Sequence, residues 1–275
     1  MTVSTLALHD GSAIPQIGLG TWPLNDAEAA RIVATAIRTG YRHIDTAAKY
    51  GNERGVGQGI RDSGLPREQI FVTTKLDGDY QGGDRAITGL DGCLKRLKLD
   101  YVDLLLIHWP LPQRGEYIST WKTFEKLHAA GKARSIGVSN FKPAHLDRLL
   151  AEASERPAVN QIQLSPLTTR AEQRAYNQAQ GIITVSWGPL APGSDLLAQP
   201  TLAALAAKYG KTPGQIVLRW HIELGQVAIP KSSNPTRLAQ NIEIFDFTLT
   251  PDEVTTISAL DTGAVPGVDS DTTGH

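Results

Sequence analysis

Short apolar runs alternate with amphipathic stretches along this chain of 275 residues. The runs are typical of buried β-strands, whereas the stretches between them repeat their apolar residues with the period of a helix. The expected strands lie at residues 16–20, 42–45, 70–74, 102–107, 133–138, 158–162, 182–187 and 227–230. Helical periodicity occupies most of the intervals, so the pattern predicts eight strand-then-helix units in succession.

The ends of the first helix can be placed from the sequence. Asn25 with Glu28 three residues later forms a capping-box pattern, and Gly40 is the kind of residue that follows a helix C-terminus. Ahead of the first strand, residues 5–17 carry apolar side chains on both sides of Asp10-Gly11, a pair that favours a tight turn. We therefore expect an N-terminal β-hairpin before the repeat begins.

Eight consecutive units without a linker or a low-complexity break predict an α/β fold. We expect one (β/α)8 TIM barrel domain over residues 1–275, because parallel strands that follow each other in sequence need helical crossovers. The length suits a single barrel of this kind, which takes roughly 250 residues. The predicted hairpin would cap this barrel.

Two helices are expected outside the repeat. The interval 188–226 is too long for one crossover, so we expect the regular barrel helix at 200–209 and an extra helix that begins at Thr212-Pro213. A second extra helix follows Pro251. The tail from Thr262 is rich in Gly, Asp and Thr, and we expect it to be loosely held.

Composition excludes several classes of protein. The net charge is −1 and Lys and Arg form no stripe, which argues against a nucleic-acid partner. Cys93 is the only cysteine, so no internal disulfide is possible. The start of the chain lacks the pattern of a signal peptide, and no apolar run reaches the roughly 20 residues of a membrane helix. We therefore expect a cytoplasmic protein that contacts neither nucleic acid nor membrane.

Ionisable groups follow three successive strands, at the barrel face where reactive groups gather. The segment YRHIDTAAKYGNE begins as a strand and then presents Asp45, Lys49 and Tyr50. Lys75 follows the next strand, and His108 follows the one after it. An unpaired buried carboxylate costs several kcal/mol, so Asp45 needs a partner. Lys75 is the best candidate, because each residue has the same place relative to its own strand.

The later strands also end in polar or aromatic residues, which core packing alone does not require. These ends are Ser139-Asn140, Asn160-Gln161, Ser186-Trp187-Gly188 and Lys231-Ser232. Taken singly, each has a structural explanation as a turn, a helix cap, rim packing or a solvated basic face. Asp45 with Lys75, taken alone, also suits a structural ion pair.

Seven motifs are spread along the chain. They are HIDTAAKYGNE (43–53), TTK (73–75), IHWP (107–110), IGVSNF (136–141), VNQIQLSP (159–166), SWGPL (186–190) and IPKSSNPTRLAQN (229–241). With these motifs the chain closely resembles the aldo-keto reductase family, in particular its bacterial 2,5-diketo-D-gluconate reductase type. The resemblance implies NADPH-dependent reduction of small aldehydes and ketones, including dicarbonyls or keto-sugars, with alcohol oxidation as the reverse reaction. It also implies four catalytic residues: Asp45, Tyr50, Lys75 and His108.

Carbonyl reduction explains these four residue types. Hydride from a nicotinamide leaves a developing alkoxide on the substrate, and an acid must protonate it. We expect Tyr50 to be that acid, with its pKa lowered from about 10 by the ammonium of Lys75, which Asp45 holds in place. His108 would direct the carbonyl oxygen and stabilise its charge through a hydrogen bond.

The nicotinamide end of the cofactor is expected near the later strand ends. Ser139, Asn140 and Gln161 carry the hydroxyl and amide groups that can bind the carboxamide. Trp187 has a flat face on which the nicotinamide ring can stack.

The other end of the cofactor is expected beside the last strand. Lys231, Ser232 and Arg237 offer two cations and a hydroxyl to a 2′-phosphate, which favours NADPH over NADH. The remaining cofactor positions implied by the resemblance are Gly188, Pro189, Leu190, Gln240 and Asn241.

The substrate is expected to be a small carbonyl compound. The resemblance places Trp22 and Trp109 beside Tyr50 and His108 in the substrate pocket. Substrate choice is expected to depend on three segments that vary in the family, namely residues 76–85, residues 191–199 and the tail from residue 262. The short tail predicts an open pocket that admits several small aldehydes and ketones. The resemblance also implies a monomer, which is the usual state in the family.

Two other functions fit parts of the pattern. A class I aldolase-like barrel would use Lys75 as a Schiff-base nucleophile. A non-enzymatic module would bind NADPH and report redox state to a partner. Borohydride trapping tests the first alternative, and consumption of bound NADPH tests the second.

Cofactor loops and metal sites of other kinds are not indicated. Gly55, Gly57 and Gly59 are spaced as G-x-G-x-G on a predicted helix without a strand directly before it, so they do not match a dinucleotide-binding loop. The sequence also contains no metal-ligand motif, and we expect a metal-independent enzyme.

Overall fold

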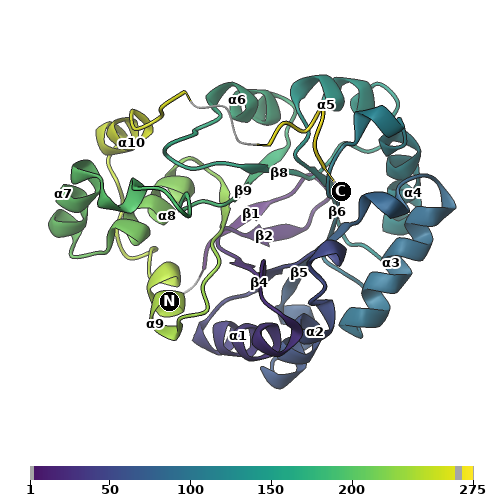
Figure 1. Cartoon of the computed structure of the whole chain (residues 1–275), viewed down its shortest axis with the longest axis horizontal. Coiled ribbons are helices and arrows are strands. Elements are labelled where there is room, and N and C mark those ends of the chain that lie inside the picture. The colour runs from purple at the N-terminus through teal and green to yellow at the C-terminus, as the bar shows by residue number, and fades with distance from the viewer. Residues whose placement is uncertain (1–2, 264–267, 275) are drawn as a thin grey trace.

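The computed structural model describes residues 3–263 and 268–274 and contains the predicted parallel barrel (Figure 1). The barrel strands are β3 (Leu19–Gly20), β4 (His43–Asp45), β5 (Phe71–Leu76), β6 (Leu104–Ile107), β7 (Ile136–Ser139), β8 (Val159–Gln163), β9 (Ile183–Trp187) and β10 (Val227–Ile229). Each pairs in parallel with the next along the chain. A parallel bridge between Ile17 and Ala228 joins the two ends of the sheet. The predicted (β/α)8 fold is confirmed.

Both faces of the barrel strands are buried, which explains their continuous apolar runs. In β6, Leu104 and Leu106 belong to a cluster inside the barrel, whereas Leu105 and Ile107 belong to the larger cluster beneath the helices. Successive residues of a strand point to opposite faces, so one apolar run serves both layers. Each helix therefore needs only one apolar face, as the sequence period predicts.

The predicted N-terminal hairpin is confirmed. β1 (Thr5–Ala7) pairs antiparallel with β2 (Ala13–Pro15), and the Leu8 amide donates to the Ser12 carbonyl across the turn at 2.8 Å. Leu8 and Ile14 pack in the cluster inside the barrel. The hairpin thus closes one end of the barrel.

Helices surround the strands (Figure 1). As predicted, α1 begins after Asn25, whose side chain accepts a hydrogen bond from the Glu28 amide at 3.0 Å, and it ends at Gly40. The helices that cover the barrel are α1 (Asp26–Thr39), α2 (Glu53–Asp62), α3 (Asp84–Leu97), α4 (Tyr117–Ala129), α5 (Pro143–Leu150), α6 (Ala171–Ala179), α8 (Pro213–Glu223) and α9 (Pro235–Ile242). In residues 3–263 and 268–274, no helix has the length and apolar character needed to span a membrane.

Two helices lie outside the repeat, as predicted. The first of them, between β9 and β10, is not the helix that the sequence indicated. The second, α10 (Pro251–Ser258), follows Pro251 as predicted. Between β9 and β10, α8 packs against β10 and α9, whereas α7 (Pro200–Tyr209) packs on the outer side of α8 (Figure 1). The assignment of 200–209 as the regular barrel helix is therefore wrong. The physical reason is apolar volume: α7 buries only Leu202 and Ala206, whereas α8 buries several large side chains, Trp220 among them.

The glycines of α2 are explained by helix packing. Gly55, Gly57 and Gly59 lie on the buried face of α2, against α1 and the end of α3. A Cβ on Gly57 would lie 2.0 Å from the Leu97 carbonyl oxygen, and one on Gly55 would lie 2.0 Å from that of Asp26. Backbones approach each other this closely only where a residue has no side chain.

The described part of the tail is held more firmly than predicted. Asp269 and Asp271 both form ion pairs with Lys142, the residue before α5, and Ser270 between them is buried. Two carboxylates on one ammonium fasten this segment to the barrel. The expectation of a loosely held tail is therefore wrong for residues 268–274. The other residues after Gly263 lie outside the described part of the chain.

Two buried histidines predict a loss of stability in acid. Complete burial lowers the pKa of both His43 and His221 to about 4. In the unfolded chain a histidine has a pKa of about 6.5, so acid protonates the unfolded state first. The stabilisation present above about pH 6.5 is lost as the pH falls towards 4. We expect each histidine to contribute at most about 3 kcal/mol to this loss.

Urea unfolding at about pH 7 and at about pH 4.5 measures the effect. His221→Gln should lose less stability between the two pH values than the wild type. His9→Gln changes an exposed histidine and should lose as much as the wild type. Equal losses in all three proteins would contradict the role of His221.

Candidate active site

A cleft of about 1240 Å³ opens at the carboxyl ends of the barrel strands. The predicted site residues that line it are Trp22, Asp45, Tyr50, His108, Trp109, Ser139, Asn140, Gln161, Trp187, Gly188, Pro189, Leu190 and Lys231. Lys75 is buried directly behind Asp45 and Tyr50. The fold thus brings most of the predicted site residues, from distant parts of the sequence, to one cavity.

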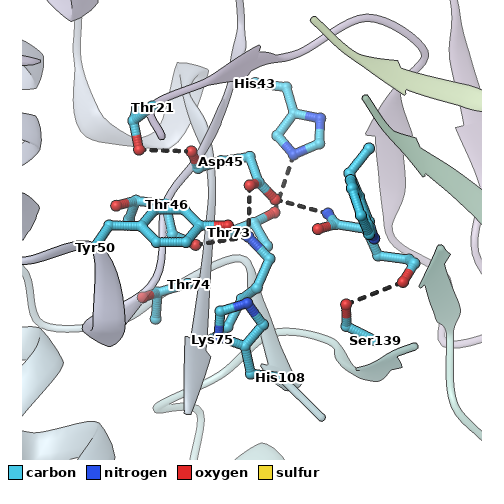
Figure 2. Close-up of polar contacts among 12 residues, drawn as sticks. Thr21, His43, Asp45, Thr46, Tyr50, Thr73, Thr74, Lys75, His108 and Ser139 are labelled. Carbon is cyan, nitrogen blue, oxygen red and sulfur yellow. Dashed lines mark hydrogen bonds and ion pairs between the residues drawn. The ribbon is translucent and has the colours of Figure 1, made fainter. Parts of the chain in front are cut away.

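The Lys75 side chain links Asp45 and Tyr50 (Figure 2). Its Nζ donates to Asp45 Oδ1 at 2.5 Å and to the Thr46 carbonyl oxygen at 2.9 Å, and it lies 3.4 Å from the Tyr50 hydroxyl. The other Asp45 oxygen accepts from Gln161 Nε2 at 2.7 Å. Lys75 and Asp45 are 1% and 3% exposed, so each buried charge is compensated within the protein. The predicted pairing of Asp45 with Lys75 is confirmed.

Strand register and one tight turn position these groups. β4 pairs with β5 so that Asp45 lies opposite Thr73, and Lys75 lies two residues further on the same face of β5. After β4, the 3-10 helix η1 (Ala48–Tyr50) ends at Gly51, which has a φ of +68°. This turn brings the phenol back over the strand ends.

Burial raises the pKa of the Tyr50 phenol, and this effect outweighs the opposing influence of the Lys75 ammonium. The expectation that the pKa of Tyr50 is lowered is therefore wrong, because a buried phenolate loses its hydration. A raised pKa keeps the phenol protonated at neutral pH, and a proton donor must hold its proton. The ammonium still reduces the cost of the phenolate once the proton has left.

Burial opposes the charge on Lys75, but Asp45 and Tyr50 outweigh burial and raise the pKa of its amine. Lys75 is therefore an ammonium at neutral pH. A Schiff-base nucleophile needs a neutral amine with a lowered pKa. The site disfavours the aldolase-like alternative.

Aromatic rings surround the phenol. The Tyr50 ring lies 5.4 Å from the Trp22 ring and 5.8 Å from the His108 ring, the latter in an edge-to-face arrangement. His108 in turn stacks near Trp109 at 6.3 Å. All four line the cleft, so the phenol hydroxyl faces a space with an imidazole and two indoles beside it.

The residues predicted for the nicotinamide form a bonded group. Asn140 Nδ2 donates to the His108 carbonyl oxygen at 3.1 Å, and Asn140 Oδ1 accepts from Trp187 Nε1 at 3.0 Å. The Ser139 hydroxyl donates to the Gln161 backbone carbonyl at 2.9 Å. Asn140 has a φ of +63°, which is uncommon for a residue other than glycine. These contacts fix the Trp187 indole at the wall of the cleft.

The residues predicted for the 2′-phosphate are divided between the cleft and α9. Lys231 lines the cleft. Ser232 and Arg237 lie outside its lining, as do Gln240 and Asn241, two further positions predicted for the cofactor. The Asn234 amide donates to the buried Ser232 hydroxyl at 3.1 Å, which orders the turn before α9, and Arg237 is exposed on the first turn of that helix. Asn241 is buried and forms a hydrogen bond with the Tyr41 phenol.

Two of the three segments predicted to control substrate choice line the cleft. Their lining residues are Ala191, Pro192, Ser194 and Thr262. No residue of 76–85 lines it. The segment contacts residues that do line it: Asp77 lies 3.6 Å from the Lys49 ammonium, and Gln81 Nε2 donates to the Trp109 carbonyl oxygen at 2.7 Å.

Several lining residues were not assigned to the site from the sequence. They include Lys49, Gln163, Ser165, Leu167, Thr168 and Ile229. For Lys49 the available signal was its place next to Tyr50 in one turn. The others follow or belong to strands whose apolar runs do not show which side chains reach the cavity.

Comparisons with known proteins agree with the fold and the motifs. A model described as the aldo/keto reductase family matches residues 16–262. An aldo-keto reductase of Mycolicibacterium smegmatis is 48% identical over 264 residues, which cover 96% of each chain. Methylglyoxal reductase DkgA of Escherichia coli is 44% identical over 272 residues, which cover 98% of each chain. A crystallised mutant of Gox0644 in complex with NADPH has a TM-score of 0.95 and 39% identity over 100% of both chains.

These similarities extend over almost the whole chain rather than over one motif or one part of the barrel. The Gox0644 structure also has the same arrangement of strands and helices. The resemblance inferred from the motifs is confirmed, and the chain belongs to the aldo/keto reductase family.

Proposed function

We propose that this aldo/keto reductase uses NADPH to reduce small aldehydes and ketones to alcohols, with Tyr50 as the proton donor. The observation that carries the proposal is the Lys75 amine, which binds Asp45 and lies 3.4 Å from the phenol oxygen at the cleft. Two similar proteins support the cofactor and substrate class: one is a methylglyoxal reductase, and one was crystallised with NADPH. Dicarbonyls and keto-sugars are among the expected substrates, and alcohol oxidation is the reverse reaction.

The four catalytic side chains handle the proton. A bound nicotinamide supplies hydride to the carbonyl carbon, and the electron pair of the C=O bond moves to oxygen. Tyr50 gives its proton to that oxygen, which yields the alcohol and leaves a phenolate. The Lys75 ammonium stabilises the phenolate, and Asp45 keeps the ammonium charged and in place. General acid catalysis of this kind contributes about 10²–10⁴ to the rate.

His108 orients the substrate. An imidazole N–H directed at the carbonyl oxygen stabilises the negative charge that develops there. The edge-to-face contact with the Tyr50 ring holds the imidazole beside the phenol. The carbonyl oxygen thus meets two donors, one that stabilises charge and one that transfers a proton.

The aromatic, amide and cationic groups of the cleft fit NADPH. Trp187, held by Asn140, offers an aromatic ring to the nicotinamide. Gln161 uses its amide nitrogen to bind Asp45, which leaves its carbonyl oxygen for the carboxamide. The segment 188–190 lines the cleft after Trp187, and Lys231 adds a cation for phosphate.

Arg237→Ala should weaken NADPH binding about tenfold and leave NADH binding nearly unchanged, because a guanidinium–phosphate bond exists only with the 2′-phosphate. Fluorescence titration with each cofactor measures the two dissociation constants. Arg148→Ala changes an exposed arginine on α5 and should bind both cofactors as the wild type does. Equal affinities of the wild type for NADPH and NADH would defeat the phosphate assignment.

The loss of NADPH absorbance with a panel of small carbonyl compounds, methylglyoxal and keto-sugars among them, tests the function as a whole. We expect several of them to be reduced. Tight NADPH binding without consumption by any carbonyl would favour the non-enzymatic alternative. A borohydride-trapped adduct on Lys75 would favour the aldolase-like alternative.

We also propose that the protein is a cytoplasmic monomer that needs no metal ion. Size-exclusion chromatography tests the monomer. Turnover after treatment with a chelator tests the independence from metal.

A further inference from the structure

Asn52 is a buried polar residue that the proposed chemistry does not use. It follows Tyr50 and Gly51 in the chain and is 0% exposed. Its Oδ1 accepts from the Thr46 hydroxyl at 2.8 Å, and its Nδ2 donates to the backbone carbonyls of Thr21 at 3.0 Å and Leu24 at 2.9 Å. Carbonyl oxygens only accept hydrogen bonds, so these partners fix the orientation of the amide and use both of its protons.

Capping of α2 does not account for these bonds. Asn52 directly precedes α2, a position where asparagine commonly caps the helix through its side chain. Here the side chain of Asn52 makes no such bond. Asp26 of α1 caps α2 instead, since its Oδ1 accepts from the Gly55 amide at 2.7 Å. The Asn52 amide therefore serves the segments around it rather than its own helix.

Thr46 connects Asn52 to the Lys75 ammonium. The Thr46 hydroxyl donates to Asn52, and the Thr46 backbone carbonyl accepts from Lys75 Nζ at 2.9 Å. The same Nζ lies 3.4 Å from the Tyr50 hydroxyl. Thr46 precedes Tyr50 in the chain and Asn52 follows it, so the bond between them closes the turn that presents the phenol to the ammonium.

The other two bonds of the amide hold part of the cleft wall. Thr21 and Leu24 flank Trp22, whose ring lines the cleft and lies 5.4 Å from the Tyr50 ring. The Thr21 hydroxyl also donates to the Asp45 backbone carbonyl at 3.0 Å (Figure 2). One amide thus ties the loop that carries Trp22 to the turn that carries Tyr50.

We propose that Asn52 is a positioning residue for carbonyl reduction, which holds the Tyr50 hydroxyl within reach of Lys75 and the Trp22 ring against the phenol. The inference rests on the proposed function and adds a residue that acts through its neighbours, because Asn52 does not line the cleft. Without its amide, the turn loses the bonds that close it. A displacement of about 1 Å at a reacting group can lower a rate by about 10².

Asn52→Ala should lower kcat for carbonyl reduction by about 10–10² and leave the dissociation constant of NADPH nearly unchanged. It should also move the basic limb of the pH profile of kcat to higher pH. The Lys75 ammonium favours the phenolate, so a more distant ammonium lets the phenol keep its proton to a higher pH. Asp45 and His108, the other titratable groups beside the phenol, are the same in both proteins.

Asn177→Ala is the matched control. Asn177 is also 0% exposed, but it lies on α6 outside the lining of the cleft. Its side chain forms hydrogen bonds with Asn160, Gln173 and Thr184. The control should lose stability as Asn52→Ala does, because both remove a buried amide, and it should keep the kcat and the pH profile of the wild type.

An Asn52→Ala protein that folds and keeps both the kcat and the basic limb of the wild type would overturn the inference and leave the proposed function standing. If Asn52→Ala does not fold, Thr46→Val decides. It removes only the hydroxyl that donates to Asn52 and keeps the backbone carbonyl that binds Lys75. It should lower kcat about two- to tenfold and move the basic limb the same way. Wild-type values of both quantities in Thr46→Val would then overturn the inference.

Fluorine NMR decides the matter if no carbonyl is reduced and the proposed function fails. In protein labelled with fluorotyrosine, the resonance that is absent from Tyr50→Phe belongs to Tyr50, and its titration gives the pKa of that phenol without turnover. A higher pKa in Asn52→Ala than in the wild type supports the positioning role, with Thr46→Val in its place if Asn52→Ala does not fold. Equal pKa values in the variant and the wild type overturn it.

Discussion

Tyr50→Phe should lower kcat for carbonyl reduction by about 10²–10⁴ while the protein still binds NADPH. The substitution removes only the hydroxyl that lies 3.4 Å from Lys75 Nζ. It keeps the ring that packs against Trp22 and His108, so the shape of the cleft is preserved. Without the phenol, the developing alkoxide must take its proton from water. NADPH absorbance measures the rate, and fluorescence titration measures cofactor binding.

Tyr80→Phe is the control for this experiment. Tyr80 is 41% exposed and does not line the cleft, so its variant should turn over like the wild type. Equal unfolding midpoints for both variants and the wild type would show that the lower kcat of Tyr50→Phe is not caused by a loss of folding. If Tyr50→Phe keeps more than about a tenth of the wild-type kcat, Tyr50 is not the proton donor, since general acids contribute at least about 10².

Lys75→Met should lower the free energy of unfolding by about 3–5 kcal/mol and abolish turnover. Methionine fills much of the same space, but it leaves the Asp45 carboxylate, 3% exposed, buried without its cation. Turnover is lost because no positive charge then stabilises the Tyr50 phenolate. Urea unfolding and NADPH absorbance measure the two effects separately.

The double variant Asp45→Asn/Lys75→Met separates stability from catalysis. It removes the unpaired charge, so most of the lost stability should return, whereas turnover should stay absent. A double variant no more stable than Lys75→Met would show that the unpaired carboxylate is not the cause of the instability. Recovery of turnover in the double variant would remove the ammonium from the mechanism.

Local patterns were sufficient to place most of the barrel. The cap at Asn25, the glycine at Gly40 and the turn at Asp10-Gly11 depend on neighbours in the chain, and all three lie where the sequence predicts. The pairing of Asp45 with Lys75 was also predictable, because parallel strands bring their carboxyl ends to one face and a buried carboxylate needs a cation.

Long-range packing decided the features that were predicted wrongly. α7 and α8 are both amphipathic, and only their contacts show that α8 covers β10. The described tail is fastened by Lys142, which is distant in sequence. The pKa of Tyr50 rises because segments distant in sequence bury much of the phenol, and the sequence pattern does not show that burial outweighs the influence of Lys75.

The sequence by itself determined the fold, the family and the residue types of the site, since hydrophobic period, turn residues and motifs are local properties of the chain. Only the tertiary structure decided which of those side chains share one cavity, how deeply each is buried and which charges remain without a partner. Burial sets the balance between desolvation and ion pairing, and that balance depends on atoms from many segments at once. Lys49 shows the difference: the sequence places it beside Tyr50, but only the folded structure brings it into the lining of the cleft and its ammonium to within 3.6 Å of Asp77.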